Sequence, residues 1–541
     1  MNVYQAVVEI LKREGTEFLS CFPANPLIDY AAAGDIRPIL ARTERTVINI
    51  ADGFSRIHNG NRIGVCCMQA GPGIENAFAG VAQAYADSVP VLILPGQGGT
   101  DRIDVPPEFD ASHNYQHVTK WVARINKPER APEMLRRAYQ MLRSGTPGPV
   151  MLELPSDVGS AEFGDSVDYE PVRPVRYGPD PADVDRAADL LLAVKRPVIQ
   201  AGQGVLYAEA TAELVELAEL LQAPVMTTLP GKSSFPEDHP LSLGCGTYTG
   251  PAQVKHMLAQ ADCLFGIGTS FTRMFLSTPI PPGKTVIHAA LDERDLNKDL
   301  VLDQALMGDA KLVLQALLAA LKARGTATEK DAADEVGELR SAWEEEWEPK
   351  LTSDETPINP YRVIHDLQQA VDVSNTIVTA DSGNPRDQIS PFYMTCKPNT
   401  YIGWGKSTQL GYSLGLAIGA KLAAPEKLVV NFVGDAAMGM CGMDIETSVR
   451  SKVPILTLLV NNSAMGGYEK HLPVATEKYG TKFLSGEYAD LAASLGAWSV
   501  KVTDPADIIP SIKEAAEQTS AGRTALVECI TCEERQFSLV R

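Results

Sequence analysis

Long apolar runs are missing from this sequence. Its 541 residues contain no uninterrupted stretch of about 18 apolar side chains, the length that a helix needs to cross a bilayer. The first residues, MNVYQAVVEILKREG, also lack the charged and then apolar regions of a secretory signal. We therefore expect a cytoplasmic location and no membrane partner.

Basic residues are outnumbered by acidic ones. The sequence has 48 Lys and Arg against 68 Asp and Glu, a net charge of -20. Binding to nucleic acid or to anionic lipid depends on basic side chains that release counterions from phosphates. The charge balance therefore argues against both of these partners.

Paired cysteines are scarce. Nine cysteines are scattered through apolar surroundings, such as Cys66 and Cys67 in RIGVCCMQA, which is typical of reduced thiols in a protein core. Cys529 and Cys532 form a CxxC motif. A structural zinc site requires a second pair of this kind, which the sequence lacks, so we expect neither zinc nor redox chemistry there.

Strand-like and helix-like segments alternate almost from end to end. This alternation is typical of α/β proteins with parallel sheets flanked by helices. A length of 541 residues suggests about three domains. Stretches rich in proline or charge separate the blocks, and the run Glu344–Glu346 indicates a solvated helix face. We predict three domains of this class, at residues 1–165, 180–325 and 355–541.

An aspartate and an asparagine follow two apolar runs in the third block. KLVVNFV is followed by Gly434 and Asp435, and PILTLLV is followed by Asn461 and Asn462. The segment between has the length of a helix, so the runs form a right-handed strand–helix–strand unit whose strands end at the same sheet edge. Ligands bind at that edge in open α/β sheets. We therefore expect Asp435 and Asn462 to lie side by side.

One carboxylate and one amide oxygen form an incomplete set of oxygen ligands. Such a set suits Mg²⁺, whose remaining ligands are water and phosphate. The small residues Gly434, Ala436 and Ala437 allow backbone amides at the start of the next helix to approach an anion. The pattern thus predicts a metal-bridged diphosphate. A second interpretation stays open here: Asp435 caps the helix and the asparagines form a turn.

The pattern resembles the cofactor-binding motif of thiamine-diphosphate-dependent enzymes, a Gly-Asp-Gly followed some two dozen residues later by Asn-Asn. Ala436 stands where that motif has its second glycine. The resemblance implies an enzyme with thiamine diphosphate and Mg²⁺ as cofactors. It places the metal on the Asp435 carboxylate, the Asn462 amide and the backbone carbonyl of Ala464. It also implies the family's domain order: pyrimidine-binding, central and diphosphate-binding.

A second element of this resemblance surrounds Glu44 in RPILARTERTVINIADGFSRI. In the family, a glutamate at this place hydrogen-bonds the aminopyrimidine of the cofactor and so activates it. The resemblance therefore implies a catalytic role for Glu44. The residue before it is Thr43, where the family often has histidine. Without the resemblance, Glu44 would be interpreted as a surface carboxylate at the start of a helix.

Other stretches are similar to segments that surround the cofactor in this family. QAGPGIENAFAG contains a Gly-Pro-Gly turn with Gly71 and Gly73. GWGKSTQLGYSLG places Leu410 where a bulky apolar side chain wedges the cofactor; a core leucine between glycines is the alternative. DSGNPRDQ departs from the family, because it has Asn384 and Pro385 in place of glutamine and histidine, but Asn384 is still expected at the cofactor.

The sequence resembles most the branch of acetolactate synthase, oxalyl-CoA decarboxylase and 2-hydroxyacyl-CoA lyase, in part through GKSSFPEDHPLSLG at 231–244. The resemblance implies an acetolactate synthase-like lyase or carboligase that acts on a 2-oxoacid next to its carbonyl group. Cleavage of an acyl-CoA substrate is the alternative, and an inactive binding or regulatory homologue is a remote one. A homodimer or homotetramer is implied, because different subunits hold the two ends of the cofactor in this family.

The same register indicates the residues on the substrate side. Glu469 and Tyr468, in AMGGYEKHLP, are candidates to contact or protonate the reaction intermediate; plain loop surface is the alternative for both. His113, in FDASHNYQHVTK, is a candidate proton relay near neutral pH; His117 lies in the same segment, and a solvated loop histidine is the alternative for both. The residues expected to contact the substrate are Ala24, Asn25 and Tyr468.

The sequence bears on nucleotide cofactors in two places. Acetolactate synthases usually bind FAD next to an acidic dipeptide pattern, whereas this sequence reads IHAALDERDLNKD at the corresponding place, so FAD or ADP on the central domain stays open. A nicotinamide oxidoreductase requires a GxGxxG motif at the start of a helix. AGQGVLYAEA offers only GxG, which is weak support for that class.

Overall fold

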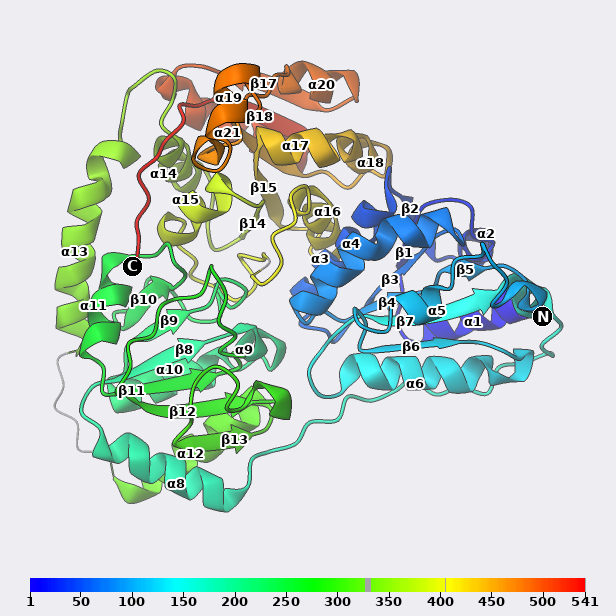
Figure 1. Cartoon of the computed structure of the whole chain (residues 1–541), viewed down its shortest axis with the longest axis horizontal. Helices are drawn as coiled ribbons and strands as arrows, with labels where there is room; N and C mark the ends of the chain where they lie inside the picture. Colours follow the sequence, from blue (N-terminus) through cyan, green and yellow to red (C-terminus); the bar gives the residue numbers. More distant parts are fainter. Residues whose placement is uncertain (326–331, 404, 541) are drawn as a thin grey trace.

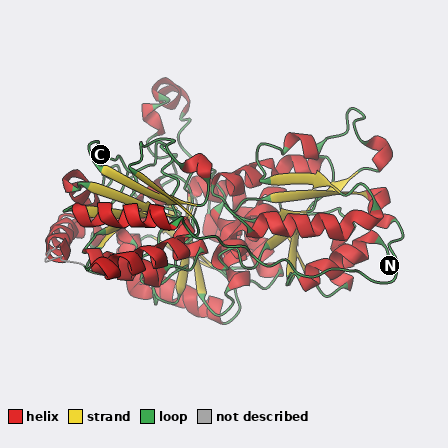
Figure 2. Ribbon diagram, turned by 90° about the horizontal axis from the view of Figure 1, so that it is seen from below, coloured by secondary structure: helices red, strands yellow, loops and turns green. Residues whose placement is uncertain are grey.

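The computed structural model describes residues 1–325, 332–403 and 405–540. They form three parallel sheets, one after another along the chain, and helices cover both faces of the sheets (Figure 1, Figure 2). The α/β class with three parallel sheets is therefore confirmed. No helix of these described residues has both the length and the apolar character needed to span a bilayer.

The first sheet has seven strands in the order β2-β1-β3-β4-β7-β5, with β6 paired to β7. Its strands are β1 (Phe18–Cys21), β2 (Arg37–Leu40), β3 (Gly64–Cys67), β4 (Val91–Ile93), β5 (Gly96–Gln97), β6 (Trp121–Arg124) and β7 (Val150–Pro155). The helices of this part are α1 (Val3–Arg13), α2 (Leu27–Ala33), α3 (Glu44–Ile57), α4 (Pro72–Ala86), α5 (Ala111–Asn114), α6 (Ala131–Arg143) and α7 (Ser156–Ser160).

The second sheet has six strands in the order β10-β9-β8-β11-β12-β13. Its strands are β8 (Pro197–Ala201), β9 (Val225–Thr227), β10 (Ser242–Cys245), β11 (Cys263–Ile267), β12 (Thr285–Ala290) and β13 (Gln304–Met307). Its helices are α8 (Pro181–Ala193), α9 (Gln203–Tyr207), α10 (Thr211–Leu221), α11 (Ala252–Gln260) and α12 (Ala310–Arg324).

The third sheet has five strands in the order β14-β15-β16-β18-β17. Its strands are β14 (Thr376–Ala380), β15 (Leu428–Gly434), β16 (Leu456–Asn461), β17 (Trp498–Val502) and β18 (Ala525–Ile530). Its helices are α14 (Pro360–Ala370), α15 (Asn384–Phe392), α16 (Ser413–Ala423), α17 (Asp435–Cys441), α18 (Ile445–Arg450), α19 (Pro473–Tyr479), α20 (Tyr488–Ser494) and α21 (Ile508–Ser520).

The charged segment before the third sheet forms α13 (Ala332–Leu351), which runs along one side of the second and third parts of the chain (Figure 1). Trp343 and Trp347 are buried in the core of the third part, whereas Glu344–Glu346 between them are exposed. The prediction of a solvated face is confirmed, and the opposite face of the same helix supplies two large core side chains.

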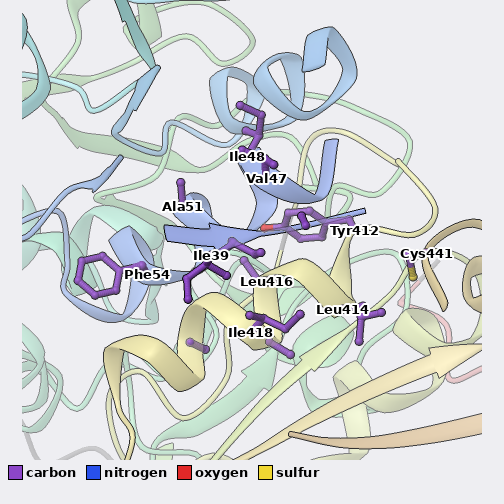
Figure 3. Packing of buried hydrophobic residues seen from close by; sticks show 14 of the residues in the cluster. Ile39, Val47, Ile48, Ala51, Phe54, Tyr412, Leu414, Leu416, Ile418 and Cys441 are labelled. Atoms are coloured by element: carbon purple, nitrogen blue, oxygen red, sulfur yellow. The ribbon is translucent and has the colours of Figure 1, made fainter. Parts of the chain in front are cut away.

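Helices α3 and α16 join the first and third parts of the chain through a shared apolar core. Phe54 of α3 and Leu416 and Ile418 of α16 belong to one apolar cluster (Figure 3). Ile48 lies on the other side of α3, against Gly80 of α4. The backbones also come very close: a β-carbon at Gly53 would lie 2.2 Å from the carbonyl oxygen of Leu416. Glycine is therefore required at this crossing, because any side chain would push the helices apart.

The two helices are parallel, with their N-termini at the same end. A β-carbon at Gly411, just before α16, would lie 3.0 Å from the Arg45 guanidinium, and one at Gly419 would lie 2.0 Å from the carbonyl oxygen of Ile50. Later residues of α16 thus lie beside later residues of α3, as expected for two helices that run in the same direction. The start of α3, which carries Glu44, lies beside the segment that leads into α16.

Candidate active site

A cavity of about 250 Å³ lies at the carboxyl edge of the third sheet. It is bounded by the ends of β15 and β16 and by the first residues of α15 and α17. The sequence-predicted residues that line it are Asn384, Leu410, Gly434, Asp435, Ala436, Ala437, Asn462, Ala464 and Tyr468. The strand–helix–strand argument therefore placed Asp435 and Asn462 at one edge correctly.

Asp435 is the first residue of α17 and is only 4% exposed. Its Oδ1 accepts a 3.0 Å hydrogen bond from the backbone amide of Ala436, whereas its Oδ2 is buried without a partner among the described residues. Burial raises the pKa of this carboxyl to about 6, against the hydrogen bonds from nearby backbone amides. A buried carboxylate oxygen that lacks a partner fits a bound cation, since an uncompensated charge there is costly.

The two asparagines after β16 have different environments. The Asn461 amide donates to the buried Glu528 carboxylate at 2.7 Å, and its oxygen accepts from the Ser463 amide at 2.9 Å. Asn462 lines the cavity, and its oxygen accepts from the Ala464 amide at 3.1 Å. The alternative interpretation of an asparagine turn is thus partly correct. It does not exclude a metal, because an amide oxygen has a second lone pair.

The N-termini of α15 and α17 both face the cavity. Gly383, with φ of 85°, precedes α15, and Gly434 precedes α17. Helix N-termini present unpaired amides and a partial positive charge, which favour an anionic group. Asn384 lies against Gly466, where a β-carbon would come within 2.3 Å of the Asn384 side-chain nitrogen. The cavity therefore combines a site for a cation with sites for an anion, as a metal–diphosphate group requires.

Glu44 is the first residue of α3 and is 7% exposed. The side chain of Asn76 lies 3.4 Å from its carboxylate, and a β-carbon at Gly73 would lie 3.5 Å from it. Gly71 adopts φ of 59° at the start of α4, a conformation that glycine allows. The glutamate and the Gly-Pro-Gly turn are thus brought together, but neither of them lines the 250 Å³ cavity within this chain.

The remaining sequence-predicted residues lie outside the cavity lining. Glu469 is paired with Lys482 at 3.1 Å and Arg535 at 3.1 Å; a backbone hydrogen bond and Lys482 lower its pKa. The side-chain amide of Asn25, next to Ala24, donates to the carbonyls of Met68 and Leu94. His113 on α5 and His117 are exposed. The roles assigned to these residues stay predictions.

The sequence analysis missed some of the residues that line the cavity. Arg386 is the third residue of α15, Phe275 is 62% exposed, and Cys532 follows β18. Cys532 was considered only as half of a CxxC pair. A better signal was its position, since β18 is hydrogen-bonded to β16 and ends at the same sheet edge as Asn462.

A second cavity, of about 700 Å³, lies at the carboxyl edge of the second sheet. Gly202 and Gly204 of the GxG sequence line it, together with Arg273 and Lys406. A β-carbon at Gly202 would lie 2.3 Å from the carbonyl oxygen of Gly268. The GxG sequence therefore allows close backbone packing, and the helix after it, α9, has only five residues.

Comparison with protein families gives three matches along the chain. Residues 1–121 match "Thiamine pyrophosphate enzyme, N-terminal TPP binding domain". Residues 184–317 match "Thiamine pyrophosphate enzyme, central domain". Residues 381–529 match "Thiamine pyrophosphate enzyme, C-terminal TPP binding domain". Glu44 falls in the first match, and Asp435 and Asn462 fall in the third.

Similar proteins have several activities in their names. A probable acetolactate synthase large subunit of Methanocaldococcus jannaschii is 32% identical over 537 residues, covering 95% of this chain and 90% of that protein. A glyoxylate carboligase of Escherichia coli O157:H7 is 27% identical, covering 97% and 92%. Benzoylformate decarboxylase from Polynucleobacter necessarius has a similar fold, with a TM-score of 0.84 at 22% identity, covering 99% and 100%.

Proposed function

Because this chain belongs to the thiamine pyrophosphate (thiamine diphosphate) enzyme family, we propose that it is an acetolactate synthase-like enzyme. In this proposal it uses Mg²⁺ with thiamine diphosphate to decarboxylate a 2-oxoacid and to transfer the remaining acyl group. The relative at 32% identity, with an acetolactate synthase name, supports this choice within the family.

The arrangement at Asp435 is the observation that carries the proposal. One cavity with two helix N-termini is lined by the Asn462 amide, by Ala464 and by a buried Asp435 carboxylate oxygen that has no partner among the described residues. Oxygen ligands in small number suit Mg²⁺, which keeps phosphate and water as its other ligands. Asp435, Asn462 and Ala464 would hold the metal, and the amides of α15 and α17 would bind the diphosphate.

The chain's own residues would bind and orient the reacting groups. Bound thiamine diphosphate would supply a carbon nucleophile for a carbonyl group and an electron sink for cleavage of the neighbouring carbon–carbon bond. Glu44, buried at the start of α3, would hold a proton at the pyrimidine end. Leu410 would support the cofactor, and Tyr468 would contact the substrate.

A second copy of the chain would complete the site. The described residues that line the cavity all come from the second and third parts of the chain, and Glu44 is not among them. Apolar side chains near the cavity are also exposed: Leu472, Val474, Tyr479 and Phe483. Exposed apolar surface of this kind is typical of an interface. We therefore include a homodimer, or a tetramer made of such dimers, in the proposal.

The test is a product assay with the purified protein, thiamine diphosphate and Mg²⁺. Pyruvate is supplied in one reaction and a 2-hydroxyacyl-CoA in another, and the products are identified by mass spectrometry. Acetolactate in the first reaction alone is the expected result. Glu44→Gln should lower kcat by about 10²–10⁴-fold. Glu129→Gln, at an exposed position just before α6, is the control and should keep normal turnover.

The 700 Å³ cavity is the observation that favours a second candidate, cleavage of an acyl-CoA. The cations Arg273 and Lys406 and the glycine-rich sheet edge would suit the phosphates of a nucleotide, whether FAD, ADP or the nucleotide part of coenzyme A. The same cavity is also lined by the carboxylates Asp87, Asp295 and Asp299. An absorption maximum near 450 nm in the purified protein would indicate bound flavin. Cleavage of the 2-hydroxyacyl-CoA without any acetolactate from pyruvate would favour the acyl-CoA candidate over our proposal.

A further inference from the structure

The segment that leads into α16 crosses from one cavity to the other. Gly405 and Lys406 line the 700 Å³ cavity, and Thr408 and Leu410 line the 250 Å³ cavity that we assign to the cofactor. Residues 405–410 form neither a helix nor a strand. Their conformation, and hence the position of Leu410, therefore depends on the groups that accept their backbone hydrogen bonds.

One buried carboxylate, Asp87, holds the first half of this segment. Its oxygens accept hydrogen bonds from the backbone amides of Gly405, at 3.2 and 3.3 Å, and of Lys406, at 3.0 Å. Asp87 follows α4 in the first part of the chain and is 3% exposed. The sequence separation is more than 300 residues, so the contact joins the first part of the chain to the segment before α16 of the same chain.

Arginine and glutamine side chains hold Asp87 itself in place. Arg56 donates to it at 3.1 Å and Gln83 at 2.9 Å. Arg56 also pairs with Asp52 at 2.6 Å and donates to the backbone carbonyl of Gly403 at 2.5 Å. Buried charges with several hydrogen-bond partners form a rigid network, because breaking any one bond leaves a charge uncompensated.

A second carboxylate holds the other end of the segment. Asp381, fully buried after β14, accepts from the backbone amides of Gly411 at 3.0 Å and Ser413 at 2.9 Å. Leu410 thus lies between two points of attachment, Asp87 on the first part of the chain and Asp381 on the third. Asp87 connects the position of Leu410 to the first part of the chain, and Gln409 adds a second connection there, because its side-chain amide donates to the carbonyl of Ala79 on α4.

We propose that Asp87 is a positioning residue for the cofactor: it orders residues 405–410 and so keeps Leu410 against the cofactor cavity. The inference rests on the proposed function, in which this cavity binds thiamine diphosphate. Asp87 lines the 700 Å³ cavity but does not line the cofactor cavity. Its effect is transmitted through two backbone amides and is seen first in the order of the segment, before any chemistry takes place.

Hydrogen exchange of the apoprotein, followed by mass spectrometry, tests the first step. Asp87→Asn removes the charge and places an amide group opposite the two backbone donors. The amides of Gly405 and Lys406 should then exchange about tenfold faster or more. Glu14→Gln is the matched control, since Glu14 is also buried beside an arginine, Arg143, and does not contact the segment. Unchanged exchange in Asp87→Asn would overturn the proposal.

Cofactor titration tests the second step. With saturating Mg²⁺, Asp87→Asn should raise the Kd for thiamine diphosphate about tenfold, while kcat at saturating cofactor stays within about threefold. In a Leu410→Ala background the same change should raise the Kd less than about twofold, because both substitutions disturb one interaction. Fully additive effects would show that Asp87 does not act through Leu410.

Two further outcomes are distinguishable. If Asp87→Asn does not fold, Asp87→Glu replaces it: this variant keeps a negative charge for Arg56 but moves the carboxylate by one methylene from the amides, and it must show the same faster exchange. If the wild-type protein does not bind thiamine diphosphate, the proposed function fails. If the wild-type protein binds thiamine diphosphate and the Kd of the variant is unchanged, the positioning role of Asp87 is contradicted, whereas the proposed function is not.

Discussion

The side-chain amide of Asn461 donates a 2.7 Å hydrogen bond to the carboxylate of Glu528, a residue that is completely buried on the neighbouring strand. The other carboxylate oxygen of Glu528 accepts from the backbone amide of Ala489 at 2.8 Å. Asn461 therefore satisfies a buried charge inside the third part of the chain, and Asn462 is left to face the cavity with Asp435. Of these two adjacent asparagines, one therefore stabilises the fold and the other lines the cavity.

We expect Asn462→Ala to weaken metal-dependent cofactor binding at least about tenfold, because the metal loses an oxygen ligand. Its melting temperature without cofactor should stay within a degree or two of the wild type, since the side chain is not part of the core. Calorimetric titration with thiamine diphosphate, with and without Mg²⁺, measures the effect. Normal Mg²⁺-dependent binding in this variant would exclude Asn462 as a ligand.

For Asn461→Ala we expect a loss of folding stability in place of a specific loss of metal-dependent cofactor binding. The substitution leaves the buried Glu528 carboxylate without one of its donors, which costs roughly 1–3 kcal/mol of folding stability. The melting temperature of the apoprotein should fall clearly. In the Glu528→Gln background the loss should shrink, because a neutral amide is less costly to leave unpaired. Equal losses in both backgrounds would contradict this account of the pair.

The contact between α3 and α16 gives a prediction from geometry alone. A β-carbon at Gly419 would lie 2.0 Å from the carbonyl oxygen of Ile50, and backbone atoms cannot rotate away. Gly419→Ala should therefore destabilise the chain by about 1–3 kcal/mol through overpacking. The control is Gly337→Ala on α13, where no atom lies within 4 Å of the new carbon. That change should leave stability equal or raise it by up to about 1 kcal/mol.

Thermal unfolding of both variants measures the difference. Because the crossing also places the start of α3 beside the segment before α16, Gly419→Ala should lower turnover as well. A Gly419→Ala variant that melts with the wild type would mean that the helices do not cross as closely as the structure has them.

His58 gives a prediction about pH. It follows α3, and its ring packs edge-on to Phe54, with the centroids 4.5 Å apart. Its Nε2 is buried and has no partner among the described residues. Burial, helped by the charge of Arg62, lowers the pKa of His58 to about 4. In the unfolded chain a histidine takes up a proton near pH 6.5.

Between pH 6.5 and about 4, the unfolded chain therefore binds a proton that the folded chain does not, so stability falls as the pH falls through this range. His58→Phe keeps an aromatic ring but removes the proton. Over the same pH interval, the melting temperature of His58→Phe should fall less than that of the wild type. Above pH 7, the plots of melting temperature against pH should run parallel for the two proteins. Parallel curves over the whole range would contradict the lowered pKa of His58.

The positions of Asp435 and Asn462 could be predicted from the sequence because they depend on local patterns. Each follows a continuous apolar run, and the handedness of a strand–helix–strand unit brings the two strand ends to one edge. The choice between Asn461 and Asn462 depends on Glu528, which lies 67 residues further along the chain. No local pattern contains that information.

The hydrogen bonds of Asp87 are a second example of contacts that no local sequence pattern predicts. Asp52 and Arg56 appear in the sequence as ordinary helix residues four apart, a spacing that also suits an exposed ion pair. Only the packing of α3 on α16 buries them and brings Asp87 to the Gly405 and Lys406 amides. Contacts between parts of the chain that are hundreds of residues apart arise from tertiary packing, and sequence periodicity does not determine them.

Complementation between two inactive variants tests whether the site forms between copies of the chain. Glu44→Gln removes the proposed proton-holding group of the first part, and Asp435→Asn removes the proposed metal ligand of the third. If each site combines Glu44 of one copy with Asp435 of another, a mixed dimer contains one intact site and one with both defects. Random pairing of co-expressed variants should then restore about a quarter of the wild-type activity, since half of the dimers are mixed and half of their sites are intact.

Each variant expressed alone should remain inactive, and both should elute as dimers or larger assemblies in size-exclusion chromatography. If the site instead forms within one copy, no activity returns. Every chain in the mixture then lacks either Glu44 or Asp435, so every site carries one defect.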